Sequence, residues 1–144
     1  MQSQQVKLVQ TSFDKVLPIA DVAADIFYSR LFELDPSLRR LFSGDMKLQG
    51  KKLMDSLRMV VGSLDKLDRV IPGVRALGER HVAYGVEEHH YDTVGEALLW
   101  TLERGLGDAF TDDVRDAWAT AYTLLAMTMK SAAAARFAVA LSRN

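Results

Sequence analysis

Hydrophobic residues recur every three or four positions along most of the chain, which is the spacing of residues on one face of an α-helix. The run from Ser3 to Val16 places Val6, Val9 and Phe13 on one such face. A second run with the same spacing extends from about Ile19 to Glu33. The pattern therefore predicts an all-α protein.

Proline, glycine and short polar residues mark where the predicted helices begin and end. Asp35 and Pro36 give an N-cap followed by a proline at the first helical position, and they predict a short helix over residues 37–42. Residues 43–45 break the hydrophobic spacing, after which a long helical face runs from Gln49 to Leu64. The first half of the chain thus contains predicted helices of very unequal length.

Three more helices are predicted in the second half of the chain. Pro72 is predicted to begin a helix that ends at Gly85, and two long helices follow, from Tyr91 to Leu106 and from Thr111 to about Leu141. Six or seven helices of such unequal length fit a globin-like packing better than a regular four-helix bundle. We find no internal repeat and expect one domain over residues 1–144.

Composition and charge exclude several classes of function. The chain has 144 residues, a formal net charge of -1 and no cysteine. The lack of cysteine excludes thiolate nucleophiles, cysteine-ligated zinc and iron–sulfur clusters. Positive and negative side chains are mixed along the chain, so we expect contact neither with nucleic acid nor with a membrane. Because the sequence shows neither a signal peptide nor a membrane-spanning stretch, we expect a cytoplasmic protein with small or neutral partners.

Three polar side chains fall on otherwise hydrophobic helix faces. Inward-facing polar residues of this kind are the candidates for binding a cofactor. His81 continues the face formed by Val74 and Leu77, so its imidazole is expected to point inward. Tyr28 points inward from the second helix, and Gln49 begins the long face after the break. Each has an ordinary structural explanation: a core histidine bonded to a backbone carbonyl, an aromatic core residue, and a partly exposed glutamine at a helix start. Together they can also line opposite walls of one pocket.

The other two histidines, His89 and His90, follow Glu87 and Glu88 in a polar turn. We expect both to be solvated loop residues rather than ligands. His81 is therefore the only convincing candidate for a metal ligand among the three histidines of the chain.

Several short segments occur in a characteristic order and spacing. They are Phe27–Phe32, Pro36, Leu41–Phe42, Gln49–Leu53, Arg80–Val86, His90–Tyr91 and Ala117–Tyr122. In this order they resemble the bacterial single-domain haemoglobins, and the globin domain of flavohaemoglobins, over essentially the whole chain. The resemblance implies a globin fold of six to eight helices around a pocket for haem b.

The resemblance also implies a role for each matching residue. His81 is implied to be the proximal ligand of the haem iron, with its other ring N–H donated to the Leu77 carbonyl, and Tyr91 is implied to lie beside it. Tyr28 and Gln49 are implied to donate hydrogen bonds on the distal side, where O₂ acquires partial negative charge. The other implied contacts with haem are Phe42, which packs flat on the porphyrin, and Lys52, Leu53, Leu57, Arg80, Val86, Val94 and Leu98. For Lys52 and Arg80, an ordinary solvated helix face is a better explanation than pairing with the haem propionates.

Two departures from the family pattern bear on function. In flavohaemoglobins a glutamate of the last helix joins the proximal histidine to the tyrosine that matches Tyr91, and here that position is about Ala133. Because no carboxylate side chain occurs after Asp116, no other residue of this helix substitutes for it, and cleavage of O–O bonds should be less favoured. The chain also ends at Asn144 without a flavin or nicotinamide domain, so a redox cycle is expected to need a separate flavin or NAD(P)H reductase.

Three hypotheses from different classes of function follow. In the first, the chain is a haem b globin, a monomer or homodimer, that binds O₂ and other diatomic ligands such as NO. In the second, it is a nitric oxide dioxygenase that works with the separate reductase. In the third, it is a haem-free globin-like sensor or interaction module, and His81 is only a core histidine. We favour O₂ binding, because binding needs only residues that the chain contains.

Overall fold

The fold consists of helices alone over the residues that the computed structural model describes, which are 1–42, 44–83 and 85–142, with the backbone alone for 83 and 135–142. The α-helices are α1 (Ser3–Val16), α2 (Ala20–Leu34), α3 (Met46–Gly62), α4 (Leu67–Ala83), α5 (His90–Leu106) and α6 (Asp112–Ser142). The 3₁₀ segments are η1 (Leu17–Ile19), η2 (Pro36–Leu41), η3 (Leu64–Lys66) and η4 (Gly107–Ala109). The all-α prediction is confirmed.

Two short-range signals act as the sequence predicts. The Asp35 carboxylate accepts the backbone N–H of Ser37 at 3.0 Å, with Pro36 at the first helical position. Gly107 ends α5 with a φ of 56°, a backbone conformation that residues with a Cβ rarely adopt. The segment that Asp35 caps is nevertheless a 3₁₀ helix, so the predicted short helix is correct in place but tighter in form.

The predicted start of α4 at Pro72 is wrong, because the helix begins at Leu67 and carries the proline in its interior. A proline there removes one backbone hydrogen bond and crowds the preceding turn. The hydrophobic spacing explains why the helix continues: Val70 and Val74, on either side of the proline, are both buried. Burial of this stripe outweighs the local penalty of the proline.

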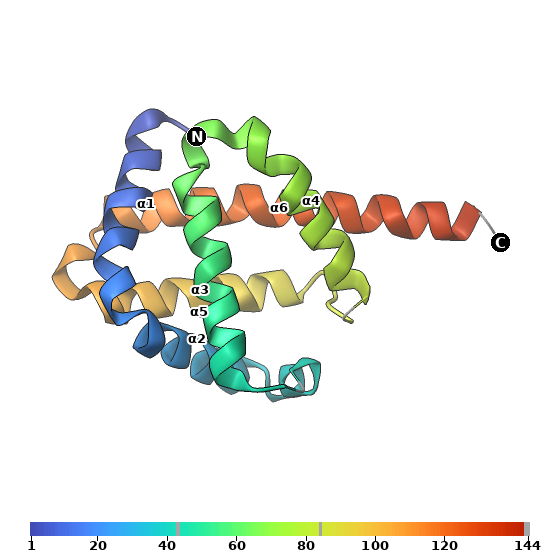
Figure 1. Ribbon diagram of the computed structural model, residues 1–144, viewed down its shortest axis with the longest axis horizontal. Coiled ribbons are helices and arrows are strands. Elements are labelled where there is room, and N and C mark those ends of the chain that lie inside the picture. Colours follow the sequence, from blue (N-terminus) through green and yellow to red (C-terminus); the bar gives the residue numbers. More distant parts are fainter. Residues whose placement is uncertain (43, 84, 143–144) are drawn as a thin grey trace.

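The helices pack in two groups that share α1 (Figure 1). The long helix α6 runs across the molecule, and α1 and α4 pack against it. The helix α2 packs against α5 and α3. Although α3 and α4 follow each other in the chain, each packs mainly on another helix, α3 on α2 and α4 on α6. None of the described helices is long and apolar enough to cross a membrane.

Two glycines allow the helices that carry candidate residues to pack closely. A Cβ atom on Gly78 would lie 2.6 Å from the backbone carbonyl oxygen of Met129, so α4 touches the backbone of α6 at this point. A Cβ atom on Gly50 would lie 2.9 Å from the Cβ of Ala24, which holds α3 close to α2. Contacts this short occur only where a residue has no side chain, so these glycines fix the position of both helices.

Candidate functional site

His81 lies in the last turn of α4, and its ring is held by the turn below it. Its Nδ1 atom is 2.7 Å from the carbonyl oxygen of Leu77. A carbonyl can only accept a hydrogen bond, so Nδ1 carries the proton and the lone pair lies on Nε2. This is the arrangement in which a histidine that binds a metal through Nε2 donates its other N–H to the backbone.

The surroundings of His81 favour its neutral form. Burial lowers the pKa of His81, and the neighbouring Arg80 lowers it further, while the hydrogen bond to Leu77 opposes both effects. A neutral imidazole is the form that binds transition metals. The same surroundings therefore keep the ring ready for a metal at neutral pH.

Tyr28 of α2 and Gln49 of α3 lie near each other where these two helices pack. Tyr28 is only 7% exposed, and the Gln49 side chain lies near enough to influence its hydroxyl. Burial raises the pKa of Tyr28, although the neighbouring Gln49 opposes this increase. The phenol therefore stays protonated at neutral pH and can donate a hydrogen bond.

The ring of Tyr28 belongs to an aromatic cluster that includes Phe42, the residue at the end of η2. The centroids of these two rings are 5.4 Å apart at an interplanar angle of 71°, and Phe32 meets Phe42 edge-on at 5.6 Å. Phe27 packs edge-on against Tyr28 at 5.0 Å. Edge-to-face contacts of this kind orient each ring. The cluster therefore fixes the direction of the Tyr28 hydroxyl.

Tyr91 in α5 lies beside His81, as the resemblance implies. The two rings are nearly parallel, at an interplanar angle of 27°, with centroids 6.5 Å apart. Tyr91 is 7% exposed, and its hydroxyl has no hydrogen-bond partner in the described part of the chain. Burial raises the pKa of Tyr91, so this hydroxyl is also neutral. Where the family pattern has a carboxylate, the half-buried Ala133 offers no acceptor.

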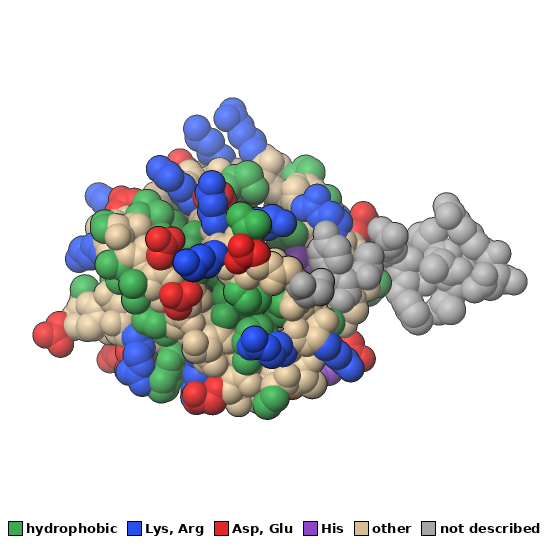
Figure 2. Space-filling view, turned by 60° about the horizontal axis from the view of Figure 1, so that its bottom comes forward, with side chains coloured by type: hydrophobic (Ala, Val, Ile, Leu, Met, Phe, Trp, Pro, Cys, Tyr) green, Lys and Arg blue, Asp and Glu red, His purple; other side chains and the backbone are tan. Residues whose placement is uncertain are grey.

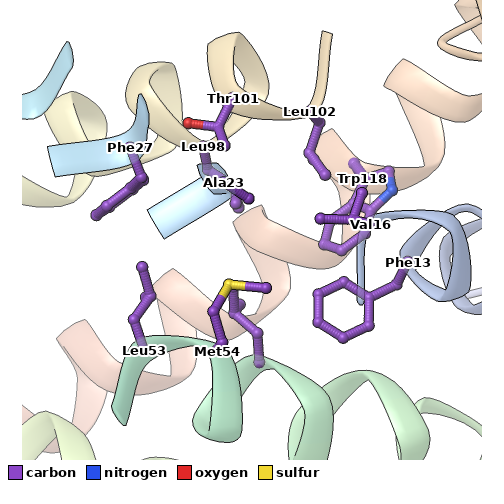
Figure 3. Close-up of a pocket in the computed structure, with 11 residues that line it drawn as sticks. Phe13, Val16, Ala23, Phe27, Leu53, Met54, Leu98, Thr101, Leu102 and Trp118 are labelled. Atoms are coloured by element: carbon purple, nitrogen blue, oxygen red, sulfur yellow. The ribbon is translucent and has the colours of Figure 1, made fainter. Parts of the chain in front are cut away.

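A small apolar cavity adjoins this site on the α3 side (Figure 3). Its volume is about 20 Å³. Its lining is Phe13, Val16, Ala23, Phe27, Leu53, Met54, Leu57, Leu98, Thr101, Leu102 and Trp118. The one hydroxyl in this lining, that of Thr101, already donates to the Ala97 carbonyl at 2.7 Å. An apolar cavity without spare hydrogen-bonding groups stays dry, so it suits small apolar molecules better than water.

Comparison with known proteins identifies the family. The model of the globin family, described as "Globin", matches residues 25–129. The chain belongs to the globin family. The predicted globin fold and the resemblance to haemoglobins are thereby confirmed.

Individual relatives of this globin include both bacterial and animal proteins. A flavohemoprotein of Bordetella parapertussis is 34% identical over 121 residues, which cover 82% of this chain and 30% of that protein. A neuroglobin of Tetraodon nigroviridis is 31% identical over 143 residues, which cover 90% of each. A solved structure of an engineered carbene transferase is also similar. It derives from a Rhodothermus marinus protein described as a putative nitric oxide dioxygenase. Its TM-score is 0.86 at 28% sequence identity, and the match covers 98% of this chain and 99% of that one. The chain spans about a third of the length of the flavohemoproteins that it matches.

The cofactor of this globin is haem b, and its residues fit that group. The Nε2 lone pair of His81 suits an iron ion, and Tyr28 and Gln49 offer polar groups from two other helices, α2 and α3. The side chains of Leu53, Leu57 and Val94 are half-buried and Leu98 is buried. On the face drawn in Figure 2, hydrophobic side chains lie among charged ones.

The remaining residues that the resemblance places against haem differ in burial. Leu77 and Val86 are half-buried, and Leu77 supplies the carbonyl that holds His81. Lys52 and Arg80 are exposed, and neither forms an ion pair with a residue that the structure describes. Their solvated positions agree with the ordinary explanation given from the sequence.

The expectation that His90 is a solvated loop residue is wrong, whereas His89 is exposed as expected. His90 is only 3% exposed, and its Nδ1 accepts the backbone N–H of Glu87 at 2.9 Å. The histidine thus closes the turn that starts α5, in the way an acceptor three residues later does in a capping box. One nitrogen of each of these histidines and an oxygen of Asp35 lie within 4.8 Å of one another. The three-residue spacing from Glu87 to His90 is the feature of the sequence that indicates this turn.

Proposed function

We propose that this globin binds O₂ reversibly, with His81 as the iron ligand. The observation that carries the proposal is the geometry of His81, whose Nδ1 is fixed by the Leu77 carbonyl so that Nε2 can bind a metal. We place Tyr28 and Gln49, which lie on α2 and α3, on the opposite side of that metal. Haem supplies the iron centre at which a diatomic molecule binds. The protein supplies one strong ligand from α4 and leaves the opposite side to hydrogen-bond donors.

Tyr28 gives the site its preference among diatomic ligands. O₂ becomes partially negative when it binds, so the protonated Tyr28 hydroxyl stabilises it, whereas the less polar CO gains little. Gln49 lies near Tyr28 and would offer a second donor on the distal side. Leu53, half-buried and one turn after Gln49, limits the space without adding polarity.

The proximal side supports binding rather than O–O cleavage. His81 donates to a neutral carbonyl instead of a carboxylate, so its ring gains little additional electron-donating character. The unpartnered hydroxyl of Tyr91 adds no further hydrogen bond within the described part of the chain. Both observations favour a stable complex with the ligand.

Absorption spectra of the purified protein test the proposal. After addition of haem, we expect a Soret band that shifts reversibly with O₂, and a His81→Ala variant should lose the histidine-ligated spectrum. His89→Ala is the matched control, because His89 is exposed and its removal should leave the spectrum unchanged. A protein without a Soret band, or a spectrum that survives His81→Ala, would contradict the assignment.

Nitric oxide dioxygenation is a second candidate function. It is supported by the likeness to the Rhodothermus marinus structure described as a nitric oxide dioxygenase, and by the flavohemoprotein relatives. A separate flavin or NAD(P)H reductase would then return the iron to the ferrous state after each cycle. Sustained consumption of NO in the presence of such a reductase would favour this function, whereas a single turnover that stops would favour O₂ binding.

A further inference from the structure

Helix α6 holds Tyr91 through two contacts on different parts of the residue. The Tyr122 hydroxyl donates a hydrogen bond to the backbone carbonyl of Tyr91 at 2.5 Å. Further along the same helix, the Lys130 Nζ lies 5.7 Å from the centroid of the Tyr91 ring. A cation within about 6 Å of an aromatic ring is attracted to its electron-rich face.

These contacts determine how Tyr91 meets His81. The hydroxyl of Tyr91 has no partner among the described residues, so hydrogen bonding does not orient its ring. Among the described residues, the ring lies beside His81, with centroids 6.5 Å apart, and beside Lys130. The packing of α5 on α6 here is tight, since a Cβ on Gly95 would lie 2.8 Å from the Tyr122 ring. Tyr91 is therefore a link between α6 and the candidate iron ligand.

The charge that Lys130 brings to this side of the pocket is only weakly compensated. The described acid nearest to it is Asp92, with an N–O distance of 4.0 Å and a side chain that is 85% exposed. Ion pairs this long and this exposed to water neutralise little charge. Lys130 itself is only 29% exposed, so its field is less screened by solvent than that of a surface lysine.

We propose that Lys130 is a positioning residue of the proximal side, which holds the Tyr91 ring against His81 and places a positive charge behind it. The inference rests on the proposed function, because its consequence concerns haem ligated by His81. A nearby positive charge favours the ferrous over the ferric state, since the ferrous state carries one positive charge less. Lys130 thus stabilises the oxidation state that binds O₂.

Redox titration of haem-loaded variants tests the effect of the charge. The titrant supplies the one electron that reduces the ferric state. Lys130→Met keeps the length of the side chain and removes its charge, Lys130→Arg keeps the charge, and Lys15→Met removes a charge from the exposed end of α1. We expect Lys130→Met to move the reduction equilibrium toward the ferric state by about three- to tenfold, with Lys130→Arg and Lys15→Met close to the unmodified protein. An equilibrium in Lys130→Met equal to that in Lys15→Met would overturn the inference.

A measurement on the haem-free protein tests the contact separately. The NMR signals of the Tyr91 and His81 rings should move in Lys130→Met and stay in place in Lys15→Met. Unmoved signals would overturn the contact even where haem binds normally. If the contact is present but the protein takes up no haem, the proposed function fails and the charge effect fails with it, while the positioning of Tyr91 stands.

Discussion

The Tyr28 hydroxyl on α2 lies beside the side chain of Gln49 on α3, within surroundings that are otherwise aromatic and aliphatic. The pair places two polar groups where the surrounding side chains offer none. Burial raises the pKa of Tyr28, so the pair keeps its proton across the physiological pH range. This relationship makes the distal side a donor to whatever ligand enters.

Replacement of Tyr28 by phenylalanine should speed the release of O₂. The variant loses one hydrogen bond to a partially charged ligand, which corresponds to roughly 1.5–3 kcal/mol, or about tenfold or more in the dissociation rate. Stopped-flow measurement of O₂ release checks this value. Gln49→Leu is the companion variant, and the double variant shows whether Gln49 takes over in the absence of Tyr28. An unchanged rate in both Tyr28→Phe and the double variant would remove Tyr28 from the mechanism.

Replacement of Gly78 by alanine should push α4 away from α6 and weaken haem binding. The new Cβ would lie 2.6 Å from the Met129 carbonyl oxygen, which belongs to the backbone and cannot turn aside. Strain of this kind costs about 1–3 kcal/mol, and it displaces the helix that carries His81. Chemical denaturation and haem titration measure the two effects.

Gly73→Ala is the matched control for Gly78→Ala. Gly73 lies in the same helix, but a Cβ there would have no atom within 4 Å. The substitution should stabilise the protein by about 0.5–1 kcal/mol, because alanine favours the helix more than glycine does. Equal effects of the two substitutions would show that the close approach of α4 to α6 is not required.

Much of the fold follows from local signals in the sequence, and the failures arise where tertiary packing decides. Asp35 with Pro36 and the glycine at position 107 act through their own backbone neighbours, so their roles are visible in the sequence. The helix start predicted at Pro72 is wrong, because burial of Val70 and Val74 stabilises α4 on both sides of the proline. Such burial depends on α6, which lies far away in the chain, and no local pattern shows it.

The candidate site shows the same division. The inward direction of His81 and Tyr28 follows from helical spacing. The contact of Lys130 with Tyr91 does not, because it joins residues of two helices whose relative rotation is set by packing. The sequence does not indicate the burial of His90 either, because its polar neighbours Glu87 and His89 suggest a solvated turn. In the structure the His90 ring is buried and accepts a hydrogen bond from the backbone of that turn.

Stability should fall as the pH drops below about 6.5, and His90 should account for part of the loss. Burial lowers the pKa of His90 from 6.5, and the charges of His89 and Arg40 add to this, while those of Glu87 and Asp35 oppose it. The unfolded chain therefore takes up a proton on this residue at a higher pH than the folded protein. The contribution is complete above pH 6.5 and is lost as the pH falls toward the lowered value.

Denaturation curves between pH 7 and pH 5 measure this effect. His90→Gln keeps an acceptor for the Glu87 N–H but does not titrate, so the decline in its free energy of unfolding should be shallower. His89→Gln should lie between the two, because it removes only the part of the lowered His90 pKa that comes from the charge of His89. A His90→Gln curve parallel to that of the unmodified protein would place the pH dependence elsewhere.

Replacement of Tyr91 by phenylalanine should leave stability unchanged or raise it by up to about 1 kcal/mol. The Tyr91 hydroxyl is buried without a hydrogen-bond partner among the described residues, so removing it removes an uncompensated polar group while the ring contacts with His81 remain. Tyr122→Phe is the opposite case, because its hydroxyl donates to the Tyr91 carbonyl, and its loss should cost about 1–3 kcal/mol. Thermal and chemical unfolding of the two variants compares an unsatisfied hydroxyl with a satisfied one in the same contact between α5 and α6. A loss of stability in Tyr91→Phe as large as that in Tyr122→Phe would mean that the Tyr91 hydroxyl does have a partner, and the proximal side would then be closer to the flavohaemoglobin pattern than the sequence of α6 indicates.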